Sequence, residues 1–214
     1  MKIIATTVLA FAAITFVSAA DNGAISYYDK TPCTNVRMGV VQDVSILNQT
    51  CATLKAGLSV AFGGSASCVD VSKVNPNVTS TYMSLDCITD TAESWAKKSF
   101  SGNYLGFGTY LDDKCTVATM SIFIAADGAC SMAGLGGPGS YKVTVNSDGS
   151  VKYDTYTNLN CSGTPQSLPI KSSELAGCTG ASGTYMKFFL SGSAFRNTAA
   201  FGSALIMALF LALF

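Results

Sequence analysis

The most regular alternation of hydrophobic and polar side chains lies in residues 140–161. Apolar and polar residues alternate over residues 141–145, residues 146–150 have the composition of a turn, and the alternation resumes over residues 151–155. A period of two is typical of a strand with one buried face, and two such runs around a short polar turn predict a β-hairpin. The hairpin leads directly to Cys161.

The end of this hairpin shows a spacing that occurs four times in the chain, a tyrosine followed by four residues and a cysteine. The tyrosines are Tyr28, Tyr82, Tyr110 and Tyr156. Residues 91–107 also match residues 172–188 without a gap, so the repetition predicts an internal duplication with copies in residues 21–108 and 109–190. We expect each tyrosine to pack beside a disulfide or a cross-strand neighbour. The alternative is that the four line a ligand platform on which sugar rings stack.

Each copy is expected to contain several strands and one short helix. The expected strands are residues 36–41, 58–62 and 104–107 in the first copy and residues 117–124, 141–145 and 185–188 in the second. A helix is predicted for residues 91–98, where Asp90 and Glu93 have the spacing of a capping box and Trp95 faces the core. Residues 40–54 fit either a strand or a helix. The predicted fold class is a β-dominated α+β fold, made of two disulfide-stapled pseudo-repeats of antiparallel strands.

The amino-terminal end has the composition of a removable signal. Residues 1–20 start with a lysine, continue with an apolar run over residues 3–16 and finish with small residues. This order is typical of a secretory signal peptide. The apolar run is shorter than the roughly 20 residues that span a bilayer, which argues against an anchor at this end.

The carboxyl-terminal end predicts a lipid anchor. Residues 204–214 are wholly apolar, and the small residues 191–193 precede them across a short spacer. This arrangement is typical of a glycosylphosphatidylinositol (GPI) attachment signal. Ser191 is the first choice of attachment residue, with Gly192 and Ser193 as alternatives, and residues 191–214 then comprise the attachment site and the removed tail. A transmembrane helix is the rival interpretation, although the run is short for it.

All eight cysteines lie between these two signals. They are Cys33, Cys51, Cys68, Cys87, Cys115, Cys130, Cys161 and Cys178. An even number in a secreted chain predicts four disulfides, and the absence of histidine and of close cysteine pairs argues against a metal site. If each copy is self-contained, the simplest scheme joins Cys33 to Cys51, Cys68 to Cys87, Cys115 to Cys130 and Cys161 to Cys178. No cofactor is expected.

The composition narrows the function classes. Without histidine, neither a Ser-His-Asp triad nor a Cys-His pair can form. The net charge is zero and no basic run exists, so nucleic acid is not an expected partner. Charged residues make up 12% of the chain, against about 25% in typical proteins. The sequons at Asn48 and Asn77 predict N-glycans, which supply solubility that charge does not.

Acidic residues could in principle form the carboxylate pair of a glycan-cleaving enzyme. Such a pair needs a separation of about 5–10 Å in an open cleft. Asp112 and Asp113 are adjacent in sequence, and Asp127 and Asp148 each precede a glycine, so all four are expected in turns. The sequence therefore favours a protein without catalytic activity.

Residues 156–165, Tyr-Thr-Asn-Leu-Asn-Cys-Ser-Gly-Thr-Pro, carry a family resemblance. They resemble a Tyr-x-Asp-x-x-Cys-Ser-Gly-Thr-Pro motif of cysteine-rich secreted, GPI-anchored and receptor-kinase ectodomains of oomycetes, with Asn158 where the motif has aspartate. The resemblance covers only this segment and implies an extracellular domain displayed at the cell surface.

The functional hypothesis is a GPI-anchored, N-glycosylated surface protein, held on the extracellular face of the plasma membrane or in the cell wall. It acts in adhesion, recognition or cell-surface structure, and its partners are the membrane, through the anchor, and glycans or another surface protein. The alternatives are a carbohydrate-binding module and a secreted glycan-cleaving enzyme.

Overall fold

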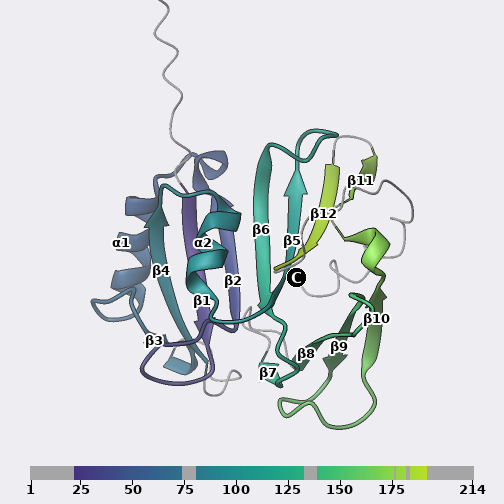
Figure 1. The fold of residues 1–214 in the computed structure, drawn as a ribbon. Coiled ribbons are helices and arrows are strands. Elements are labelled where there is room, and N and C mark those ends of the chain that lie inside the picture. Colours follow the sequence, from purple (N-terminus) through teal and green to yellow (C-terminus); the bar gives the residue numbers. More distant parts are fainter. Residues whose placement is uncertain (1–21, 74–80, 133–138, 176, 182–183, 192–214) are drawn as a thin grey trace, which may run out of the picture.

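The structure, a computed structural model, describes residues 22–73, 81–132, 139–175, 177–181 and 184–191. Its strands form two sheets in which all pairings are antiparallel (Figure 1). The eight-stranded sheet has the order β11-β12-β5-β6-β2-β1-β4-β3, and the four-stranded sheet has the order β10-β9-β8-β7. The β-dominated α+β fold class is therefore confirmed.

The bounds of the elements are as follows. The large sheet contains β1 (Asn22–Tyr28), β2 (Met38–Asp43), β3 (Val69–Asp70), β4 (Tyr82–Ile88), β5 (Tyr104–Tyr110), β6 (Ala118–Ala125), β11 (Cys178–Ala181) and β12 (Thr184–Leu190). The small sheet contains β7 (Ser131–Met132), β8 (Ser140–Val145), β9 (Val151–Tyr156) and β10 (Gln166–Ile170). The α-helices are α1 (Cys51–Ala61) and α2 (Ala92–Ser99), and the 3-10 turns are η1 (Val44–Leu47), η2 (Val71–Lys73) and η3 (Ser172–Glu174).

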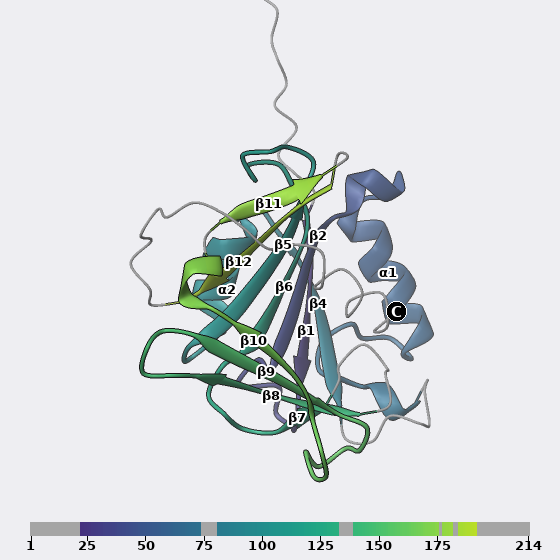
Figure 2. The same ribbon diagram turned by 90° about the vertical axis from the view of Figure 1, so that its right-hand side faces the viewer.

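The central strands of the large sheet are buried on both faces, because each face has its own cover. Strand β5 is buried at six of its seven positions, in keeping with its aromatic and glycine composition. One face packs against α1 and the small sheet, and the other packs against α2. Figure 2 shows the two helices on opposite sides of the large sheet and the strands of the small sheet crossing those of the large one.

The larger core lies between the two sheets. The large sheet contributes Phe107 and Phe188, whose ring centroids are 5.1 Å apart. The small sheet contributes Val143, Val151 and Ile170, each no more than 1% exposed. Val143 and Val151 are inward residues of the alternating pattern that predicted the 141–155 hairpin, and that hairpin is confirmed as β8 and β9.

The second core is aromatic and forms beneath α2. Trp95 lies against Gly39 on β2 so closely that a Cβ atom at position 39 would overlap the indole ring. Trp95 also contacts Phe123 on β6, with ring centroids 5.8 Å apart, and only 7% of Trp95 is exposed. The prediction that Trp95 faces the core is confirmed, and Gly39 is what lets the short helix approach the sheet.

The helix α2 occupies the predicted position but has a different cap. Thr91 is its N-cap residue and accepts a hydrogen bond from the backbone N–H of Ser94 at 3.2 Å. The predicted cap, Asp90, forms an ion pair with Lys98 at 2.7 Å instead. A threonine hydroxyl satisfies the free N–H groups of the first turn as an aspartate would, so the helix starts one residue later.

Two other predictions about helices are wrong. Residues 58–62, expected as a strand, lie at the end of α1, where Leu58 and Phe62 are one turn apart and both pack against the larger core. The alternation of apolar residues there also fits the spacing of one helix face. The second copy was expected to contain a helix of its own, but both α-helices of the described chain precede residue 109, and η3 is a single 3-10 turn.

The predicted boundary between copies, after Gly108, falls within β5. The large sheet nevertheless has two similar halves, because the β1–β2 hairpin and the β5–β6 hairpin lie side by side with their outer neighbours β4 and β12. Tyr28 pairs with Tyr82 across one half, and Tyr110 pairs with Tyr185 across the other. The strand register thus matches Tyr82 with Tyr185.

All eight cysteines form disulfides, but each of the four predicted pairings is wrong. The bridges are Cys33–Cys68, Cys51–Cys87, Cys115–Cys178 and Cys130–Cys161. As predicted, no bridge joins residues 21–108 to residues 109–190. The prediction chose the shortest loops, whereas strand pairing decides which cysteines meet. For example, Cys87 lies opposite Gly23 on β1, and a Cβ atom at Gly23 would lie 3.8 Å from the sulfur of Cys51.

The bridges close segments of 31 to 63 residues. In the chain-entropy model, loops of this length stabilise the fold by roughly 4 kcal/mol for each bridge. The longest, Cys115–Cys178, encloses the whole small sheet between its ends. The bridge Cys51–Cys87 therefore holds α1 to β4 of the large sheet, whereas Cys130–Cys161 joins the residue before β7 to the loop after β9.

We expect the substitution Gly39→Ala to lower the free energy of unfolding by about 1–3 kcal/mol, because the new methyl group forces Trp95 out of its position. Gly57→Ala is the matched control, since position 57 lies on α1 with nothing within 4 Å of a Cβ atom. This control should be neutral or more stable by about 0.5–1 kcal/mol. Urea unfolding monitored by tryptophan fluorescence measures both, and equal effects at the two positions would contradict the close packing.

Candidate functional site

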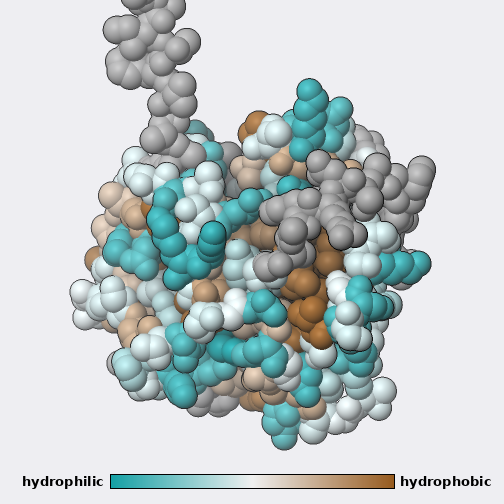
Figure 3. Space-filling model, in the orientation of Figure 1, coloured by the Kyte–Doolittle hydropathy of each residue, from teal (hydrophilic) through white to brown (hydrophobic). Residues whose placement is uncertain are grey.

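A hollow beside α2 is the candidate functional site. It has a volume of about 660 Å³ and lies over the ends of β5 and β12, where α2 no longer covers the large sheet. Figure 3 shows hydrophobic surface reaching the exterior in this region of the molecule. The lining residues are Thr91, Glu93, Ser94, Lys97, Phe100, Ser101, Gly102, Asn103, Tyr104, Phe189, Leu190 and Ser191.

The floor of the hollow is apolar and rigid. Tyr104 and Phe189 belong to neighbouring strands and are 8% and 4% exposed. Phe100 adds a third ring, with its centroid 5.1 Å from that of Tyr104. Phe189 lies over Gly106, where a Cβ atom would overlap its ring. The floor therefore offers ring edges set in the second core, with no freedom to rearrange.

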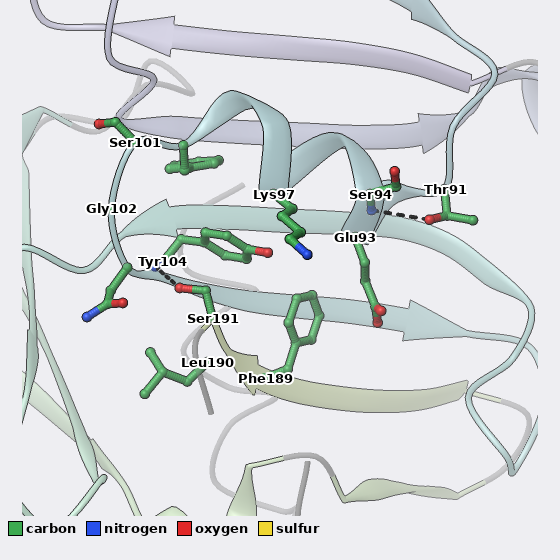
Figure 4. A pocket seen from close by; sticks show the side chains of 12 residues that line it. Thr91, Glu93, Ser94, Lys97, Ser101, Gly102, Tyr104, Phe189, Leu190 and Ser191 are labelled. Carbon is green, nitrogen blue, oxygen red and sulfur yellow. Dashed lines mark hydrogen bonds between the residues drawn. The ribbon is translucent and has the colours of Figure 1, made fainter. Parts of the chain in front are cut away.

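The rim of the hollow is polar and carries one charge of each sign. Glu93 and Lys97 are one helical turn apart on α2, and Figure 4 shows both side chains directed toward Tyr104 and Phe189. Both residues are exposed, and neither side chain makes a hydrogen bond or an ion pair with another residue in the part of the chain that the structure describes. Ser101 and Asn103 supply further hydrogen-bonding groups. The site thus combines an apolar floor with a polar rim whose charges balance.

The charge of Glu93 acts on the tyrosines beneath α2. Burial, together with the negative charges of Glu93 and Asp112, raises the pKa of Tyr110 to about 12. Burial and then Glu93 likewise raise the pKa of Tyr104. Both phenols stay protonated at neutral pH, so neither is available there as a general base.

Ser191, the predicted attachment residue, lies at this site. Its backbone N–H donates to the carbonyl of Tyr104 at 2.9 Å, and its hydroxyl accepts from the backbone N–H of Tyr104 at 2.7 Å (Figure 4). These bonds extend the pairing of β12 with β5 by one residue. The chain therefore leaves the sheet at the edge of the hollow. The alternative attachment residues Gly192 and Ser193 lie outside the described residues, as do residues 1–20.

The four tyrosines of the predicted ligand platform do not lie together. Tyr28 and Tyr110 are buried, and the hydroxyl of Tyr28 is 3.2 Å from that of Ser84. Tyr82 is the half-buried neighbour of Tyr28, while Tyr156 is half-buried in the small sheet. Because two rings are buried and a third is in the other sheet, the arrangement fits the scaffold interpretation. The hollow at Tyr104 was missed because its residues come from three separate elements.

The other predicted residues are placed as follows. Asn48 is exposed at the end of η1, in the left-handed conformation, directly before α1. Asn77 lies outside the described residues. Asp112 accepts hydrogen bonds from the hydroxyl of Thr116 and from the backbone N–H groups of Thr116 and Val117, and Asp148 accepts from the hydroxyl and the backbone N–H of Ser150, so both shape turns as predicted. These bonds explain why the pKa of each carboxyl is lowered.

A second charged cluster surrounds Arg37, at the junction of the two sheets. Its guanidinium contacts both oxygens of Asp127, at 2.6 and 3.0 Å, the carboxylate of Asp29 at 3.1 Å and the hydroxyl of Ser131 at 2.8 Å. The backbone carbonyl of Arg37 accepts a hydrogen bond from the hydroxyl of Tyr141. The arginine thus ties β2 to β7 and β8, and its charge stands between the two carboxylates.

The cluster separates the pKa values of its two acids. Hydrogen bonds from Arg37 hold the pKa of Asp127 below its usual range, whereas burial raises the pKa of Asp29. The adjoining hollow, between Asp29, Lys30 and Arg37, measures only about 180 Å³. Because Arg37 contacts Asp29, Asp127 and the hydroxyl of Ser131 on β7, the cluster links the start of β2 to the small sheet.

No protein-family model matches this chain, and neither a curated protein nor a solved structure matches it significantly. Within the described residues, no group of three or more histidine, cysteine, aspartate or glutamate side chains is arranged to hold a metal ion. No helix among the described segments has the length and apolar character needed to cross a membrane.

We expect Asp127→Asn to change the pH dependence of stability. Because its pKa is lowered in the fold, the carboxylate stabilises the protein above the unfolded pKa of about 4, and this contribution is lost as pH falls through the folded pKa. The burial of Asp29 acts with the opposite sign but is common to both proteins. The variant should melt below the wild type at pH 6, and the gap should narrow toward pH 2. Melting curves from pH 2 to 6 measure it, and a constant gap would contradict the pairing.

Proposed function

We propose that this protein is a GPI-anchored extracellular glycoprotein that acts without catalysis in adhesion, recognition or cell-surface structure. The observation that carries the proposal is that all eight cysteines pair into four disulfides. Disulfides persist in oxidising compartments, so the bridges support an extracellular protein. The apolar amino-terminal segment with its small-residue end supplies the secretion signal that this location requires.

The anchor is proposed at residues 191–193. In the attachment reaction, the peptide bond that follows the attachment residue is exchanged for an amide bond to the ethanolamine amine of a preformed glycolipid, and the apolar tail leaves as a peptide. Ser191 directly follows β12 and pairs with Tyr104 through two hydrogen bonds, and this position beside the large sheet supports an attachment there. A duplication of one secreted module is proposed as the origin of the two similar halves of the large sheet.

We favour a role in recognition over catalysis, because the described residues offer little catalytic chemistry. The chain contains no histidine, the cysteines are oxidised, and the carboxylates of Asp29 and Asp127 both pair with Arg37. Glycans displayed at Asn48, an exposed position, and at Asn77 would add to the polar surface of a protein with few charges.

A carbohydrate-binding module is the second candidate, and the hollow beside α2 favours it. Its volume of about 660 Å³ is ample for a small saccharide, and its floor is apolar while its rim donates and accepts hydrogen bonds. Asn103 and Glu93 are the residues that we expect to contact sugar hydroxyls.

We expect phosphatidylinositol-specific phospholipase C to release the native protein from intact cells into the medium. The control is Leu209→Arg, which interrupts the apolar run of residues 204–214 and should abolish surface attachment. Immunoblots of medium and membrane fractions measure both. A protein that stays in the membrane pellet after treatment would instead have a transmembrane anchor.

For the carbohydrate-binding alternative, we expect a soluble form to bind immobilised cell-wall polysaccharides, and Asn103→Ala to weaken that binding at least tenfold. Such a loss corresponds to removal of one or two good hydrogen bonds, about 1.4 kcal/mol. Asn146→Ala is the control, because Asn146 is exposed in the turn between β8 and β9 of the small sheet and does not line the hollow. Unchanged binding by the Asn103 variant would place the glycan elsewhere on the surface.

A further inference from the structure

We propose that the hollow beside α2 holds the phosphate and first sugars of the protein's own lipid anchor. The inference rests on the proposed function, because it requires an anchor at residues 191–193. It assigns a ligand to the hollow, because Ser191, the first-choice attachment residue, is one of the residues that line it. The occupant has a phosphodiester followed by neutral hexoses, which is the chemistry that every GPI anchor places next to the protein.

Covalent geometry puts this occupant at the rim. Ser191 is held to Tyr104 by two hydrogen bonds, so its position relative to the hollow is set by the sheet. Each additional residue extends the chain by at most about 3.8 Å, so attachment at Ser193 moves the ethanolamine by no more than roughly 8 Å. The anchor therefore begins within reach of the hollow for all three candidate attachment residues.

Charge and polarity at the rim suit the same occupant. The ammonium group of Lys97 points into the hollow and has no anionic partner among the described residues, so a phosphate there would gain a charge-assisted hydrogen bond (Figure 4). Glu93, Ser101 and Asn103 can bond the hydroxyls of a hexose. Beneath the rim, the nearly buried rings of Tyr104 and Phe189, 8% and 4% exposed, form an apolar floor for its C–H groups.

Tethering removes the main difficulty of such a site, which is that a shallow hollow binds single sugars weakly. A ligand on a short linker has an effective concentration of about 1 mM or more. A site with a dissociation constant of about 0.3 mM would then be roughly three-quarters filled. Docking of the glycan would also fix the orientation of the protein, with α2 and the adjoining edge of the large sheet turned toward the membrane.

The experiment compares two soluble forms of the whole extracellular chain. Phosphatidylinositol-specific phospholipase C cuts on the lipid side of the inositol phosphate, so the released protein keeps its complete glycan. The second form ends at Ser193 and is secreted without an anchor. Both are labelled with an amine-reactive reagent, and mass spectrometry reads the modification of Lys97 and of Lys98. Lys98 is the internal control, since its side chain is 66% exposed and pairs with Asp90 away from the hollow.

Lys97 should react about fourfold more slowly in the glycan-bearing form, as three-quarters occupancy requires, while Lys98 reacts equally in both forms. Hydrogen exchange gives a second readout, with residues 101–104 and 189–191 slower in the glycan-bearing form. Lys97→Gln should abolish that difference and Lys98→Gln should keep it.

Equal reactivity of Lys97 in the two forms overturns the docking and leaves the anchor intact. Protection of Lys97 in both forms also overturns it, because the cover would then be residues of the chain. Failure of the phospholipase to release any protein overturns the anchor and the docking together, so the two failures are distinguished.

Discussion

Burial of both faces of the large sheet is the constraint on which the rest of the structure depends. A strand such as β5 has apolar or glycine residues on both sides, so neither side can face water. The chain meets this requirement with two different covers, the small sheet and α1 on one face and α2 on the other. Everything outside the large sheet can be understood as one of these covers or as a link that holds a cover in place.

The covers differ in size, and the difference creates the candidate site. The helix α2 has eight residues and is therefore only about 12 Å long. It covers the centre of its face, where Gly39 allows Trp95 to approach, and leaves the ends of β5 and β12 open. The hollow is the part of an apolar face that a short helix cannot reach, and the polar side chains of the helix and of the following loop form its rim.

The links are of two kinds. The disulfide Cys51–Cys87 ties α1 to β4 of the large sheet, and Cys130–Cys161 closes the segment that forms most of the small sheet. The Arg37 cluster joins the two sheets, where no disulfide lies between them. A chain with so few charged residues uses three of them in this one cluster. Arg37 is mostly buried, and removing one of its acids would leave a poorly solvated charge at the junction of the sheets.

Local sequence patterns predicted much of the secondary structure. The hairpin of β8 and β9, the aromatic strands β5 and β12 and the helix around Trp95 were all predicted, because each depends on periodicity and turn or cap residues within a few positions. Residues 58–62 were assigned wrongly because a short apolar run fits a strand and one helix face equally well. Only contact with the core distinguishes the two, and Leu58 and Phe62 meet the core from a helix.

The sequence by itself determined that the chain is β-rich and that histidine chemistry is absent. For self-contained copies it also predicted that the cysteines pair within residues 21–108 and within residues 109–190, as they do. Tertiary structure alone decided which cysteines meet, that Tyr28 and Tyr110 are buried, and that Lys97, Tyr104 and Ser191 share one hollow. The reason is physical, since periodicity records which face of an element is apolar. The register and order of strands in the sheet, which decide what lies beside that face, arise from contacts between residues far apart in the chain.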